Sequence, residues 1–106
     1  MTINEFIIKT RSFDICGHEK TRPRVMCADG FSISVQVGYG LYCKPYKNNA
    51  DHYDEVELGF PNKEDLMIKD YAEDCDNLCN TVYPYVPVEL VDGLIRKHGG
   101  FVNFNE

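Results

Sequence analysis

Apolar and polar residues alternate most clearly in the stretch RVMCADGFSISVQVG, residues 24–38. A period of two is typical of a strand with one buried face, and the Asp29-Gly30 pair is a strong signal for a tight hairpin turn. A two-residue turn would set Met26 opposite Ile33. The sequence therefore predicts a β-hairpin whose buried face consists of Met26, Ala28, Phe31, Ile33, Val35 and Val37.

Three more segments of the chain have an extended character. YGLYCKPY, residues 39–46, is expected to form a third strand, and YDEVELGFP, residues 53–61, a fourth strand with Val56 and Leu58 facing inward. TVYPYVP, residues 81–87, is expected to be extended because its prolines do not fit inside a helix.

Helical periodicity appears twice in the second half of the chain. The first helix is expected to begin near Asn62 with an apolar stripe of Met67, Ile68, Tyr71 and Ala72. The second is expected to begin at Pro87 and to end at Gly99-Gly100, with a buried stripe of Leu90, Val91, Leu94 and Ile95. His98 is expected to cap this helix. FVNF, residues 101–104, is expected to return as a short strand, and the first twelve residues to form either a short helix or an edge strand.

Together these elements predict an α+β fold: a small antiparallel sheet of three or four strands, covered by one or two helices. A length of 106 residues, with 43% apolar and 26% charged residues, fits a single domain over residues 1–106 that folds without cross-links. No apolar run is long enough to span a bilayer, and MTINEFIIKTR lacks the pattern of an export signal. We expect a soluble protein of the cytoplasm, with no membrane partner.

The charge is distributed unevenly along the chain, whose net charge is −6. Residues 51–76 contain ten acidic residues and two lysines. Such a concentration repels nucleic acid and could attract a basic protein surface, although a solvated face that only confers solubility is an equal alternative. The candidate partner-binding residues include the acids Asp70, Glu73 and Asp74. Tyr83 and Tyr85, on either side of Pro84, are the candidate exposed anchors.

Cysteines and histidines indicate a metal site. Structural zinc is commonly held by two close ligand pairs on separate loops, and the chain has a Cys-x-His pair and a Cys-x3-Cys pair in turn-like segments. They predict a closed Cys3His zinc site formed by Cys16, His18, Cys75 and Cys79. Two alternatives are unliganded cysteines packed as small apolar residues and a redox pair.

The five cysteines, an odd number without an export signal, are expected to be reduced. Cys27 and Cys43 lie in predicted strands, where buried free thiols are the default, and they are the first replacements for Cys16 and His18 as ligands.

No catalytic motif is evident. The chain has no phosphate-binding glycine loop and no nucleophile elbow, so we expect a protein that is not an enzyme. A small-ligand-binding or sequestering domain, stabilised by zinc, is the alternative to a partner-binding protein. It would need a pocket with convergent basic groups, for which Arg22 and Arg24 are the candidates.

Three stretches, RVMCADGFSISVQVGYGLYCKPY, YDEVELGFP and TVYPYVPVELVDGLIRKHGG, resemble a family of small uncharacterised proteins of phages and prophages. The resemblance covers residues 24–100. Its specific pieces are the Cys27–Gly30 turn, Tyr42-Cys43, Gly59–Pro61 and the helix start at Pro87–Asp92. The family has no established chemistry, and its members often lack the thiol pair at Cys75 and Cys79.

Small acidic phage proteins include many anti-CRISPR inhibitors, which bind a CRISPR effector nuclease and block its guide or target DNA. By that class analogy, the expected function is an anti-CRISPR-like inhibitor that binds a bacterial CRISPR effector nuclease through protein–protein contacts and has no direct contact with nucleic acid. A mimic of DNA needs several carboxylates in a row, which residues 51–76 could supply. A third hypothesis is a zinc module of a mobile element without an inhibitory role.

Overall fold

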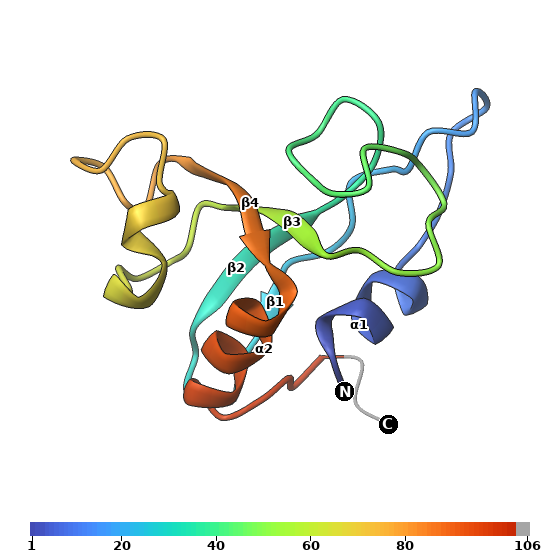
Figure 1. Cartoon of the computed structure of the whole chain (residues 1–106). Coiled ribbons are helices and arrows are strands. Elements are labelled where there is room, and N and C mark those ends of the chain that lie inside the picture. The colour runs from blue at the N-terminus through green and yellow to red at the C-terminus, as the bar shows by residue number, and fades with distance from the viewer. Residues whose placement is uncertain (104–106) are drawn as a thin grey trace.

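Four antiparallel strands form an open sheet in the computed structural model, which describes residues 1–103 (Figure 1). The strands are β1 (Val25–Met26), β2 (Ser32–Gln36), β3 (Glu55–Gly59) and β4 (Val82–Pro87), in the order β1-β2-β3-β4. The predicted α+β fold is confirmed. Pro84 and Pro87 fall on β4, an edge strand, where a missing N–H is tolerated and discourages pairing with another chain.

Two short helices complete the fold. Helix α1 (Ile3–Lys9) begins with a capping box in which Thr2 and Glu5 bond each other's backbone N–H, and helix α2 (Val88–Lys97) follows β4 directly. The main core forms where α1 and α2 pack with the sheet (Figure 1). Its largest fully buried side chains include Phe6, Ile7, Phe31, Ile33, Leu58 and Leu94.

The hairpin is confirmed, but its predicted register is wrong by one residue on β1. Cys27 and Phe31 close a three-residue turn, and Val25 pairs with Ile33. Val25 and Cys27 therefore face the core, while Met26 is exposed. The extra turn residue is accommodated because Gly30 takes a φ of +93° and Asp29 accepts the Phe31 N–H.

Three expectations for other elements differ from the structure. Residues 39–46 form turns rather than a strand, and only Lys44 makes an isolated bridge, to Glu55. The first predicted helix is a single 3-10 segment, η1 (Leu66–Tyr71), which begins after Asp65 rather than Asn62. Of the returning strand, Phe101 makes only an isolated bridge to Cys27, and residue 104 lies outside the described residues.

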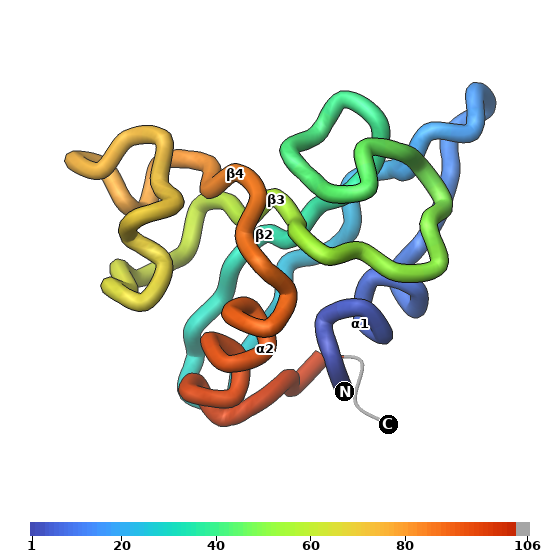
Figure 2. The backbone as a smooth tube through the Cα atoms, viewed as in Figure 1, coloured from blue at the N-terminus to red at the C-terminus, as the bar shows by residue number. Residues whose placement is uncertain are grey.

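The antiparallel register divides the connections between two ends of the sheet. Gln36 pairs with Glu57, so residues 37–54 lie at one end, and residues 60–81 lie at the other end because Gly59 pairs with Val82. The segment that precedes β1 joins the first end, where the Arg22 N–H bonds the side chain of Gln36. Figure 2 shows these two groups of loops on opposite sides of β4.

Candidate functional site

A small hairpin between α1 and β1 carries at its tip, residues 14–18, three side chains of types that can ligate a metal. Phe13 and Glu19 pair at its base, and the backbone N–H groups of Cys16 and His18 both donate to Asp14 Oδ1, at 2.9 and 3.0 Å. The carboxylate, thiol and imidazole ligand atoms of Asp14, Cys16 and His18 all lie within 4.8 Å of one another and are exposed. This hairpin tip could hold a metal ion.

The predicted Cys3His site is wrong. Cys16 and His18 lie at the end of the sheet that holds residues 37–54, whereas Cys75 and Cys79 lie in residues 60–81 at the opposite end (Figure 1). Within residues 1–103, Asp14, Cys16 and His18 form the one group of three or more such ligands. The spacing of the two pairs along the chain carried no information about which end of the sheet each loop joins.

Cys27 and Cys43 do not replace Cys16 and His18 as metal ligands. Cys27 and Cys43 are buried free thiols at opposite ends of the sheet, as core residues are expected to be. Burial raises the pKa of Cys27 to about 11 and also raises the pKa of Cys43. Both thiols are therefore protonated at neutral pH.

Glu19 fixes the base of the hairpin in a buried network. Its carboxylate accepts hydrogen bonds from the guanidinium groups of Arg11 and Arg22, from the Tyr53 hydroxyl at 3.0 Å and from the Asn49 backbone N–H at 2.8 Å. Burial acts to raise the pKa of Glu19, but these bonds outweigh it and lower that pKa below its ordinary value. The hairpin is thereby tied to residues 47–53.

Four exposed tyrosines form two pairs, one of which lies beside this hairpin. The Tyr39 and Tyr46 rings are tilted against each other with centres 5.2 Å apart, and the Tyr42 and Tyr85 rings are tilted with centres 5.7 Å apart. The Tyr39 ring also stacks with the ring of His18 at 6.4 Å. The four side chains are 42–63% exposed. We call them the tyrosine surface: Tyr39, Tyr42, Tyr46 and Tyr85.

The position of Tyr85 results from a β-bulge. Pro84 and Tyr85 stand together opposite Glu57, and Tyr85 has a φ of +53°, which is unusual for a residue with a side chain. Its N–H donates to the carbonyl of Tyr42 rather than to β3. Backbone strain of this kind is common at binding sites. The backbone conformation at the bulge directs the Tyr85 side chain toward solvent.

Tyr83, predicted as a second exposed anchor, is fully buried, so that prediction is wrong. Its hydroxyl donates to the carbonyl of Leu78. The bulge explains the difference, because it breaks the alternation that would otherwise give Tyr83 and Tyr85 the same face.

The acidic residues of segment 51–76 do not form one face. Asp51 and Asp54 precede β3, while residues 62–80 project from the opposite end of the sheet (Figure 1). We call residues 62–80 the acidic lobe; its six acids and two lysines give it a net charge of −4. Leu66, which is 74% exposed, and Met67 are also at its surface.

The three predicted acids of the lobe, Asp70, Glu73 and Asp74, are all exposed. Asp74, however, stabilises the loop: its carboxylate accepts the Asp76 N–H at 3.0 Å and the Asn77 side chain at 2.9 Å. These hydrogen bonds lower its pKa. Asp70 and Glu73 are the carboxylates more available to a partner.

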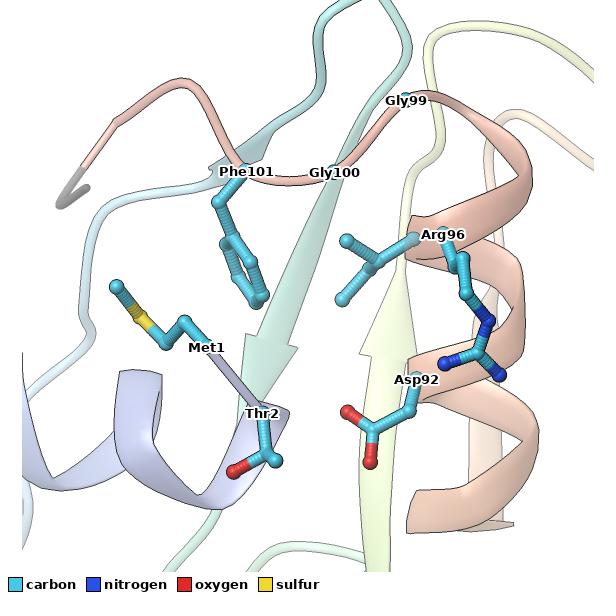
Figure 3. Close-up of a pocket in the computed structure, with 8 residues that line it drawn as sticks. Met1, Thr2, Asp92, Arg96, Gly99, Gly100 and Phe101 are labelled. Carbon is cyan, nitrogen blue, oxygen red and sulfur yellow. The ribbon is translucent and has the colours of Figure 1, made fainter. Parts of the chain in front are cut away.

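A cavity of about 520 Å³ opens between the start of α1 and the end of α2. Figure 3 shows the apolar side chains of Met1 and Phe101 on one wall and the charged side chains of Asp92 and Arg96 on the other. The predicted basic groups are elsewhere: Arg22 is buried against Glu19, and Arg24 bonds Ser32.

His98 does more than cap α2. Its ring stacks on Phe31 at 4.0 Å, and its two nitrogens lie 2.6 Å from Asp29 Oδ2 and 2.7 Å from Asp65 Oδ2. Both contacts are hydrogen bonds only when the ring carries two N–H donors. Asp65 is buried and also accepts the Lys97 ammonium, so this cluster joins the hairpin turn, the lobe and α2.

Comparisons with protein-family models, curated proteins and solved structures find no match. Among residues 1–103, the helices are too short to span the apolar part of a membrane.

Proposed function

We propose that this protein is a non-enzymatic binding protein that inhibits a bacterial CRISPR effector nuclease in the host cytoplasm. The observation that carries the proposal is the tyrosine surface, where four side chains are exposed and their rings contact each other in two tilted pairs. Tyrosine is enriched at binding hot spots because it provides a large, rigid contact area with a polar end.

The acidic lobe supports the choice of partner. Its net charge of −4 would attract a basic surface, such as the groove in which a nuclease holds its guide or target strand. Leu66 and Met67, exposed among the carboxylates, add apolar contact area. The resemblance to phage proteins supports the same class. Because the carboxylates are divided between two ends of the sheet, the lobe alone would present the charge.

The test is a panel of purified CRISPR effector nucleases, each assayed for cleavage of a guide-matched DNA and for complex formation by size-exclusion chromatography. We expect stoichiometric inhibition of at least one member. The double variant Y39A/Y46A should weaken that inhibition about 30-fold, which corresponds to ~2 kcal/mol. M26A is the matched control, because Met26 is an exposed apolar residue on β1, at the sheet edge opposite Tyr85. If no nuclease is bound, or if Y39A/Y46A inhibits like M26A, the proposal is wrong.

The cavity supports a second candidate, the binding of a small zwitterion with an apolar body. Asp92 Oδ1 accepts the Ile3 N–H at 2.8 Å, which leaves its other oxygen for an ammonium group, while Arg96 could pair with a carboxylate. Met1 and Phe101 would contact the apolar part. Thermal unfolding with apolar amino acids tests this candidate: the melting temperature should rise for the wild type and not for R96M.

We propose that the hairpin tip binds zinc. This open site replaces the closed Cys3His site that the sequence predicted. The tip offers three ligands at an exposed position, which is typical of a site that completes its coordination with another molecule.

A further inference from the structure

We propose that Asp14, Cys16 and His18 form an open transition-metal site, with three protein ligands and a fourth position for water or a side chain of another molecule. The site is distinct from the tyrosine surface and the acidic lobe, and its existence does not depend on the proposed inhibitory function. All three ligands come from a five-residue segment, so a metal needs only local adjustment of the chain.

One distance at the tip fits an edge of a tetrahedral coordination sphere. Asp14 Oδ2 lies 3.4 Å from His18 Nδ1, which is longer than the usual 2.7–3.2 Å of a good N–H···O hydrogen bond. Two ligand atoms, each ~2.1 Å from a tetrahedral zinc ion, lie about 3.4 Å apart. The separation therefore matches one edge of a zinc coordination sphere.

The two oxygens of Asp14 have different roles. Oδ1 accepts both backbone N–H groups of the tip, which fixes the carboxylate, while Oδ2 faces His18. This arrangement positions a ligand before the metal arrives, as outer-shell hydrogen bonds do in known metal sites.

The mixture of ligands selects the class of metal. Mg²⁺ and Ca²⁺ prefer oxygen ligands alone, whereas one thiolate, one imidazole and one carboxylate suit Zn²⁺ and Co²⁺. Glu19, which follows His18, holds the hairpin base in its buried network, so the tip stands on a fixed support. The Tyr39 ring, 6.4 Å from the His18 ring, places this ligand beside the tyrosine surface.

Titration of the full chain with Co²⁺ tests the site, because a thiolate bound to Co²⁺ gives a charge-transfer absorption band. We expect one Co²⁺ per chain and its displacement by Zn²⁺, which binds such ligands more tightly. C16S should abolish the band, and H18A should weaken Co²⁺ binding at least tenfold. The double variant C75S/C79S is the matched control and should bind like the wild type.

Circular dichroism establishes that each variant is folded; Cys16 and His18 are exposed, so neither change disturbs the core. Absence of the band in the wild type overturns the proposal. A band that survives in C16S but is lost in C75S/C79S also overturns it, because the metal would then lie in the acidic lobe. Inhibition of a nuclease is a separate measurement, so failure of one proposal leaves the other standing.

Discussion

At the scale of single residues, Asp65 is the carboxylate with the most structural consequences. Burial acts to raise its pKa, but hydrogen bonds from the Met67 N–H, His98 and Lys97 outweigh it, so the pKa lies below the ordinary 3.8. A carboxylate with a depressed pKa in the folded state stabilises the fold above its unfolded pKa. That stabilisation is lost as the pH falls through the lower, folded value.

We expect D65N to lower the free energy of unfolding at pH 7 by about 3 kcal/mol, because it removes the charge that faces His98 and Lys97. The difference from the wild type should begin to narrow below about pH 3.8, where the carboxylate of the unfolded chain takes up a proton, and should be smallest below the lower pKa of the folded state, where the wild-type carboxylate is also neutral. Urea unfolding at several pH values measures both effects, with D70N at an exposed site as the control. A difference that is constant with pH would contradict this assignment.

Glu19 gives a second prediction at this scale. The Arg22 guanidinium is buried, and its Nη1 already has no hydrogen-bond partner within residues 1–103. E19Q would remove the anion that compensates this charge, and we expect a loss of about 3–5 kcal/mol in the free energy of unfolding. E89Q, at an exposed position of α2, should change stability by less than about 0.5 kcal/mol. Equal unfolding curves for the two variants would show that the network contributes little.

At the scale of elements, the end of α2 depends on backbone geometry. Gly99 has a φ of +93°, and a Cβ there would lie 2.8 Å from the Cβ of Ala28. Gly100 has a φ of +86°, but a Cβ at that position meets nothing within 4 Å. The two glycines therefore share the left-handed conformation and differ in the space around them.

We expect G100A to cost about 1–2 kcal/mol for the left-handed backbone alone. G99A should cost about 1–3 kcal/mol more, because the new methyl group overlaps Ala28. Thermal unfolding of the two variants in parallel measures the difference. If both lose the same stability, the packing of α2 against the hairpin turn is looser than the structure indicates.

Local patterns predicted most of these elements, and the errors arise where strand pairing and tertiary packing override those patterns. Alternation placed Phe31, Ile33 and Val35 inside correctly, because β2 is regular. Sequence reasoning failed for Tyr83, expected to be exposed beside Pro84, since a bulge is set by pairing with β3 and leaves little trace in the sequence. It failed again for residues 39–46, whose apolar side chains include the tyrosines that the fold leaves exposed.

At the scale of the whole molecule, chain spacing could not predict the candidate sites. Cys16 and His18 belong together, as the sequence indicated, and Asp14 joins them through the turn of a hairpin that was not predicted. Cys75 and Cys79 were assigned to the same site, but the order of the strands sends their loop to the other end of the sheet. The same topology divides the acidic segment, which composition alone presents as continuous.

This division gives a prediction about association with a partner. Charges that steer two proteins together act mainly on the association rate, and salt weakens the effect. If the acidic lobe meets a basic surface, the triple variant D70K/E73K/D76K should lower the association rate constant at least tenfold at low salt and by much less at high salt. Asp76 replaces Asp74 here, because Asp74 holds the loop.

The matched control is D51K/D54K, which reverses exposed charges at the other end of the sheet. Stopped-flow or surface-based kinetics with an inhibited nuclease would measure the rates for both variants. A larger effect of D51K/D54K would place the contact beside the tyrosine surface alone and leave the lobe as a solubilising feature. A larger effect of the lobe variant would mean that the partner extends across β4, from the tyrosines at one end of the sheet to the carboxylates at the other.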